Sequence, residues 1–195
     1  MSLMPCFDKG QGLDESTVLA RLLAGYGEIE LQMCMCLIVV EGDIDTPIRT
    51  IFEKTGAERR IKKGRKALRV EYAKAGLLAE LTVALADLDW CRQIRNQYSH
   101  CQWFWIASRG LCFVNLEELA KQPNIITSVT AKTHRIDVPL LEKQEEYFWY
   151  VKQCFMHLEI AYRAWNEGRA RGGRARPASF VYPKPAKIPR PPAHN

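Results

Sequence analysis

The sequence contains no Cys-x-x-Cys pair, no internal repeat and no acidic residue after Glu167. Its most apolar run, Met33–Val40, is far shorter than the about 20 residues that a membrane-spanning helix needs. Met1–Gly12 has acid and glycine where a secretory signal needs an apolar stretch. The seven cysteines are an odd number, and most lie inside apolar runs, as free thiols do. We therefore expect a cytoplasmic protein with no membrane contact.

The absence of paired cysteines also argues against zinc. The side chains that zinc could accept as ligands are Cys91, His100, Cys101 and Cys112. Cys34 and Cys36 would point to nearly opposite sides of a helix, so they could not hold one ion together. We expect neither a metal nor another cofactor.

Charge is unevenly distributed along the chain. Seven of the 28 Lys and Arg residues lie in 169–195, a segment without Asp or Glu, so residues 1–168 carry 21 basic and 22 acidic side chains. The same segment holds six prolines, and such a composition cannot bury a core. We predict a basic, disordered tail that could bind nucleic acid weakly, contact an acidic partner or have no role.

Apolar residues recur at three- and four-residue steps over most of the chain, which predicts helices. The first helix begins with a cap at Asp14 and contains Gly25 and Gly27, which could bend or split it. A short helix begins with a cap at Asp45 and ends near Gly56. The predicted helices cover 15–41, 45–56, 57–74, 77–101 and 139–168.

Residues 103–138 follow a different pattern. Trp103–Ile106 and Leu111–Leu116 are short aromatic and apolar runs on either side of Ser108-Arg109-Gly110, which predicts a β-hairpin closed by a turn. Asn115 could cap a single turn of helix after the hairpin. Further short strands are predicted at 125–130 and 134–138.

These elements predict an all-α bundle of four to five helices. The bundle spans residues 14–168, and a β-containing insertion occupies 103–138. Residues 1–13 form an N-terminal extension, and 169–195 form the tail.

The chemically most informative stretch is Arg95-Asn96-Gln97-Tyr98-Ser99-His100. A histidine can move protons near neutral pH, and an arginine presents a fixed fork of donors to phosphate oxygens. On an ideal helix Arg95 and His100 lie roughly 140° apart around the axis. They can address one phosphate if the arginine bends, if the helix unwinds near His100, or if a second chain supplies the complementary group. A structural ion pair of the arginine and a backbone or dipole contact of the histidine would give the same pattern without activity.

This stretch resembles the signature of the HEPN superfamily: an arginine, a polar residue that is often asparagine, three residues and a histidine. The all-α layout, with the motif late in one long helix and another long helix after it, is similar to that family as well. The resemblance implies an HEPN-like homodimer whose two motifs face one cleft, acting as a metal-independent endoribonuclease. It implies that Arg95 holds and polarises the phosphate, that Asn96 orients the site and that His100 is the acid or base.

The implied reaction is attack of a ribose 2′-OH on the adjacent phosphorus, which leaves a 2′,3′-cyclic phosphate and a 5′-OH end. DNA lacks this hydroxyl and should not be cleaved. Such a protein would be a toxin or defence effector, with a possible antitoxin protein as partner. The alternative is a non-catalytic HEPN-fold dimer that binds RNA, a nucleotide or a protein. The insertion and the basic tail depart from the compact form of the family.

The helix predicted at 57–74 carries a dense basic run that could track an RNA backbone or could be a solvated face. The candidate RNA-binding residues are Arg92 beside the motif and, in this run, Arg59, Arg60, Lys62, Lys63, Arg65 and Lys66. Glu28 or Glu30, which interrupt the apolar first helix, could pair with Arg92 or Arg95.

The aromatic residues after the motif also have two interpretations. Trp103, Phe104 and Trp105 could stack on unpaired bases, or they could be buried in the core or in a dimer contact. Alternation along a strand would place Trp103 and Trp105 on one face and Phe104 on the other.

Overall fold

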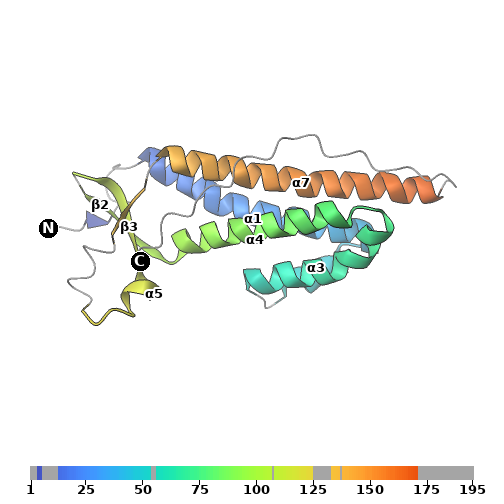
Figure 1. Ribbon diagram of the computed structural model, residues 1–195, viewed down its shortest axis with the longest axis horizontal. Coiled ribbons are helices and arrows are strands. Elements are labelled where there is room, and N and C mark those ends of the chain that lie inside the picture. The colour runs from blue at the N-terminus through green and yellow to red at the C-terminus, as the bar shows by residue number, and fades with distance from the viewer. Residues whose placement is uncertain are drawn as a thin grey trace. The chain divides into compact units, whose positions relative to one another are not determined.

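The computed structural model describes residues 4–5, 13–53, 56–106, 108–124, 133–136 and 138–170. They form a mostly helical chain with one small antiparallel sheet (Figure 1). The helices are α1 (Leu13–Glu41), α2 (Asp45–Phe52), α3 (Ala57–Lys74), α4 (Leu78–Ser99), α5 (Leu116–Leu119) and α7 (Val138–Ala170). The strands are β1 (Met4–Pro5), β2 (Cys101–Ile106), β3 (Gly110–Asn115) and β4 (His134–Arg135). The prediction of a mostly helical chain with a small β insertion is confirmed.

The described residues group into two compact units. The sheet unit contains the described residues up to Ala24 together with those of Gln93–Tyr147. The helical unit contains those of Gly25–Arg92 and continues from Phe148 along α7. Helices α1, α4 and α7 each contribute residues to both units.

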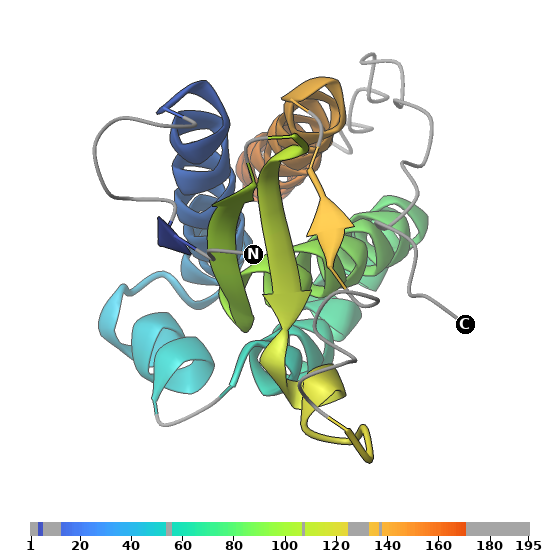
Figure 2. The same cartoon turned by 90° about the vertical axis from the view of Figure 1, so that its left-hand side faces the viewer.

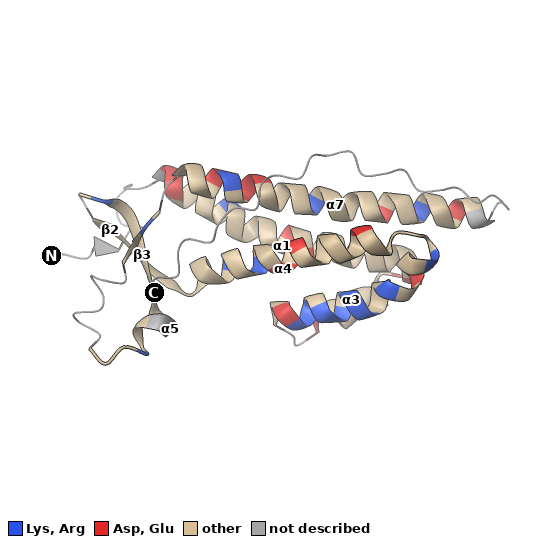
Figure 3. Ribbon diagram, viewed as in Figure 1, with Lys and Arg blue, Asp and Glu red and all other residues tan. Residues whose placement is uncertain are grey.

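In the helical unit, α3 shows how a charge-rich segment becomes a packed helix. Its buried residues recur at three- and four-residue steps and form one face; they are Ile61, Gly64, Leu68 and Tyr72. Tyr72 stacks on Tyr162 of α7 with ring centroids 4.9 Å apart, and its hydroxyl donates to the carbonyl of Leu158 over 3.4 Å. The many Lys and Arg residues of α3, blue on the ribbon in Figure 3, therefore lie on the rest of its circumference.

By length and composition alone, α1 could cross a membrane over Asp14–Glu41. The sequence analysis considered only the short apolar run Met33–Val40, whereas the whole helix is long and apolar enough to span a membrane. Polar side chains of α1 bind other helices of the helical unit: Lys152 Nζ lies 2.6 Å from Glu28 Oε2, and Gln32 donates to Glu159 over 2.8 Å.

The start of α1 differs from the prediction. The helix begins at Leu13, so Asp14 lies in its first turn and is not its cap. A carboxylate in the first turn still favours the helix because it faces the positive end of the helix dipole. Gly25 and Gly27 do not split α1. Burial along the helix outweighs the roughly 1 kcal/mol that each glycine costs relative to alanine.

The short helix α2 also differs in its boundaries. Asp45 is its first residue and not its cap, and Asp43 Oδ1 accepts a main-chain N–H of the first turn over 2.8 Å. Pro47 lies in the first turn, as predicted, where its missing N–H costs nothing. The helix ends at Phe52 and not near Gly56, because the next residue is extended.

The strands of the sheet unit lie in the order β1-β2-β3-β4 (Figure 2). β2 and β3 form the predicted hairpin, in which Cys101 faces Asn115 and Ile106 faces Gly110. Gly110 has a φ of 78°, a conformation that glycine adopts without strain. β1 comes from the predicted N-terminal extension and pairs with β2, so this segment adds a strand to the sheet.

Both faces of the central strands are covered. Trp103 of β2 packs against Phe113 of β3 and against Tyr98, with ring centroids 5.1 and 5.8 Å apart. Phe104 belongs to a separate buried cluster, whose other members are Ile106, Cys112, Val114 and Leu119. The predicted alternation is confirmed for Trp103 and Phe104, and both are buried. Trp105 is half-buried.

Some predicted elements lie outside the described residues. These are the strand predicted at 125–130 and residues 171–195 of the predicted tail. The strand predicted at 134–138 is shorter than expected, because β4 ends at Arg135 and α7 already begins at Val138.

Candidate functional site: the end of helix α4

The motif lies where α4 gives way to the sheet. Arg95 and Asn96 belong to the last turns of α4, Ser99 is its last residue, and His100 is in the turn that follows. The sequence predicted that the helix would continue to about Cys101. It ends earlier because Cys101 is already paired with Asn115 in the hairpin. The ideal-helix angle between Arg95 and His100 therefore does not apply.

Within the helix, the first two motif residues are joined. Arg95 Nη1 donates a hydrogen bond to Asn96 Oδ1 over 3.1 Å, and both residues are half-buried. An arginine has five N–H donors, and this bond uses one of them. The bond is compatible with the orienting role expected of Asn96.

A carboxylate from the insertion faces the histidine. His100 Nδ1 lies 3.8 Å from Glu117 Oε1, and the two side chains are 51% and 71% exposed. Glu117 lies in the single turn α5, and its main-chain N–H is bonded to Asn115 Oδ1 over 2.9 Å. This is the cap predicted for Asn115, and it places a negative charge beside the imidazole.

Within the motif, a buried tyrosine fixes the end of α4. The Tyr98 hydroxyl donates to Gln144 Oε1 of α7 over 2.8 Å, and the indole of Trp103 donates to the carbonyl of Tyr98 over 3.3 Å. Burial raises the pKa of Tyr98 far above its usual range, so it stays a neutral donor. Arg95 and His100 are thus presented from a well-packed base, as a precise site requires.

Other predicted participants are engaged elsewhere. Arg92, in the helical unit, donates to Asp89 over 2.8 Å. Glu28 pairs with Lys152, and Glu30 Oε1 lies 3.1 Å from Arg60 Nε. The sequence predicted that Glu28 or Glu30 pairs with Arg92 or Arg95. Both carboxylates instead pair with cations of other helices, Glu28 with α7 and Glu30 with α3.

The basic residues of α3 divide into two groups. Arg60 and Lys62 are paired, with Glu30 and with Glu58 respectively. Lys74 at the end of the helix is paired with Glu71. The candidates without an ion pair to any residue that the structure describes are Arg59, Lys63, Arg65 and Lys66. The unpaired group is the part of the run that could attract an anion.

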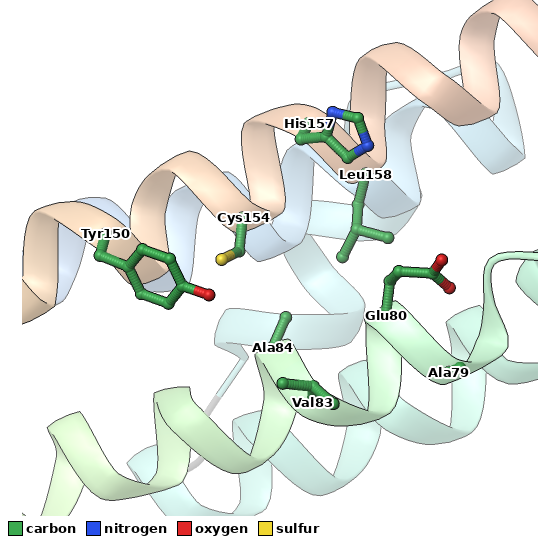
Figure 4. A pocket seen from close by; sticks show the side chains of 8 residues that line it. All are labelled: Ala79, Glu80, Val83, Ala84, Tyr150, Cys154, His157 and Leu158. Carbon is green, nitrogen blue, oxygen red and sulfur yellow. The ribbon is translucent and has the colours of Figure 1, made fainter. Parts of the chain in front are cut away.

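Two cavities lie in the helical unit. A cavity of about 290 Å³ lies between α4 and α7 (Figure 4) and is mostly apolar. Its lining residues are Ala79, Glu80, Val83, Ala84, Tyr150, Cys154, His157 and Leu158. A groove of about 510 Å³ lies between α2 and α3 and is lined by Arg49, Thr50, Glu53, Lys63, Lys66 and Ala67. Neither is lined by a residue of the motif.

Among the residues that the structure describes, no group of three or more His, Cys, Asp or Glu side chains could hold a metal ion. Comparisons with protein-family models, curated proteins and solved structures find no match to this chain. The HEPN resemblance therefore rests on the motif and on the helical layout.

Two residues of interest escaped the sequence analysis. Arg49 lies in a short helix whose sequence has no basic run, and only the packing of α2 beside α3 brings it to the groove. Glu117 could have been found from the hairpin, because the pairing of Cys101 with Asn115 carries His100 towards the start of the next helix.

Proposed function

We propose that the chain is a metal-independent endoribonuclease of the HEPN type. The observation that carries the proposal is the arrangement at the end of α4: a guanidinium oriented by Asn96, followed by a half-exposed imidazole that the ended helix releases. A phosphate-binding group and a proton-transfer group thus lie within six residues on a packed support. This is the combination that cleavage of a phosphodiester needs.

In the proposed mechanism, the ribose 2′-OH attacks the neighbouring phosphorus and the bond to the 5′ oxygen breaks. One imidazole takes the proton of the 2′-OH, and a protonated imidazole gives a proton to the leaving 5′ oxygen. Arg95 stabilises the charge that develops on the phosphoryl oxygens. Asn96 keeps the guanidinium in place through the 3.1 Å bond.

The acid and the base are proposed to be two copies of His100, one from each protomer of a homodimer. A single motif supplies one imidazole, whereas this transfer uses two proton-transfer groups. The exposure of His100 supports the proposal, because its side chain is 51% exposed and could meet a second chain or a substrate.

Labelled RNA incubated with the purified protein tests the proposal. The protein should cleave RNA but not DNA of the same sequence, and Arg95→Ala should lose the activity by roughly 10²–10³-fold. Mixing wild-type protein with an excess of His100→Ala protein tests the shared site, because each heterodimer then holds only one His100 and should be as inactive as the His100→Ala homodimer. Full activity of the Arg95→Ala protein would remove the mechanism.

A second candidate is a non-catalytic dimer that binds RNA. The unpaired cations of α3 favour it, since they can bind phosphates whether or not the motif reacts. Salt-dependent RNA binding by a protein that cleaves no RNA would support this alternative.

A further inference from the structure

The groove between α2 and α3 combines cations from two helices. Arg49 comes from α2, and Lys63 and Lys66 come from α3. One carboxylate, that of Glu53, shares the lining, so the charged side chains of the groove carry two net positive charges. The groove measures about 510 Å³, and Thr50 and Ala67 complete its wall.

None of the three cations is neutralised by a close partner. No ion pair joins Arg49, Lys63 or Lys66 to another residue of the described part of the chain. On the same helix Lys62 lies 2.6 Å from Glu58, and Lys74 is paired with Glu71. Lys62 and Lys74 thus have carboxylate partners, while Lys63 and Lys66 in the groove remain available for an external anion. Arg59 and Arg65 also lack an ion pair to a described residue, but they do not line the groove.

Arg60 helps to hold together the two helices that form the groove. Its guanidinium is directed to Glu30 at 3.1 Å and lies over the Phe52 ring, 5.6 Å from the centroid. Phe52 is the last residue of α2 and Arg60 belongs to α3, so this contact helps to hold α2 beside α3. The groove is therefore a built feature of two packed helices and not a set of independent surface charges.

We propose that the α2–α3 groove is an RNA-backbone site in which Arg49, Lys63 and Lys66 bind phosphate oxygens. The choice of RNA as the polyanion rests on the proposed function, whereas the affinity for phosphate rests on the groove alone. Arginine and lysine side chains contribute most of the sequence-independent affinity for nucleic acid, and a concave wall lets them approach one phosphate from two sides. The site belongs to the helical unit.

Binding of a fluorescent single-stranded RNA is measured as a function of salt, with every protein carrying His100→Ala so that no RNA is consumed. Lys63→Ala/Lys66→Ala should weaken binding and lower the slope of log affinity against log salt by about 1.4, since each contact to single-stranded nucleic acid accounts for about 0.7. Arg49→Ala should lower it by about half as much. Glu53→Gln should strengthen binding.

The matched control is Lys62→Ala/Lys74→Ala. It also removes two positive charges from α3, but from lysines that are paired with carboxylates. Its effect on the slope should be clearly smaller. Equal effects of the two double variants would overturn the site in favour of diffuse attraction. Binding to anionic lipid vesicles without binding to RNA would overturn the assignment of the ligand. Because binding is read without cleavage, an inactive wild type would refute the nuclease while leaving this result intact.

Discussion

The carboxylate of Glu30 joins two helices through one oxygen: Oε1 accepts the Tyr26 hydroxyl over 3.0 Å and lies 3.1 Å from Arg60 Nε. The Glu30 side chain is 5% exposed and that of Arg60 is 24% exposed. Burial, and next the charge of Glu30, raise the pKa of Tyr26 far above its usual range. A buried carboxylate of this kind depends on its cation, because an unpaired charge is costly in a protein interior.

Arg60→Ala should therefore lower the free energy of unfolding by about 2 kcal/mol, less than for a fully buried pair because Arg60 is partly solvated. The neighbouring Arg59→Ala, at an exposed position without an ion pair to a described residue, should change it by less than about 0.5 kcal/mol. Urea denaturation of both variants measures the difference. Equal stabilities would mean that the Glu30–Arg60 pair contributes nothing.

Gly64 and Gly27 should respond in opposite ways to alanine. A Cβ at Gly64 would meet Met33 Sδ at 2.7 Å, and Met33 is fully buried. Gly64→Ala should thus destabilise the protein, because overpacking costs about 1–3 kcal/mol and exceeds the gain in helix propensity. A Cβ at Gly27 meets nothing within 4 Å, so Gly27→Ala should stabilise by about 0.5–1 kcal/mol. Thermal melts of the two variants test the packing of α3 on α1.

Cys36 should make stability fall at high pH. Burial raises the pKa of this thiol from 9.0 to about 12. Between these values the unfolded chain loses the proton while the folded chain keeps it, so stability falls as pH rises from about 9 towards 12. The loss at pH 11 should be on the order of 2 kcal/mol, and Cys36→Ala should lack it. Denaturation of wild type and Cys36→Ala at pH 8 and pH 11 measures how much stability each protein loses with pH. Equal losses would contradict the prediction.

Tyr98→Phe should show that the motif depends on its support. The change removes the donor to Gln144 Oε1, which is fully buried, and should cost about 1–2 kcal/mol of stability. Cleavage of RNA should also fall, since Tyr98 holds the end of α4 from which Arg95 projects. Lower stability with undiminished cleavage would show that the motif does not need this anchor.

Much of the fold could be predicted because periodicity reports local structure directly. The bounds of α3 follow from its apolar face, and the hairpin follows from two short runs around Gly110. Cap positions were less predictable: an aspartate one or two residues away serves as well, so Asp43 and not Asp45 bonds to the first turn of α2. The pairing of Glu30 with Arg60 could not be predicted, because it depends on which helices pack together.

The residues of the candidate site were chosen from the sequence, whereas their geometry could not be predicted. The spacing of Arg95 and His100 indicated the chemistry, whereas the end of α4 at Ser99 depends on strand pairing beyond the helix. The carboxylate of Glu117 reaches His100 only through the hairpin. The periodicity of a helix does not predict tertiary contacts of this kind.

The central claim is that His100 and Arg95 cleave RNA without a metal. The most direct test incubates end-labelled RNA with wild-type protein in EDTA beside the His100→Ala variant and maps the product ends. Wild type should give 2′,3′-cyclic phosphate and 5′-OH ends, and His100→Ala, although folded, should be slower by at least about 100-fold. Cleavage by purified His100→Ala at the wild-type rate, or products with 5′-phosphate ends, would contradict the account.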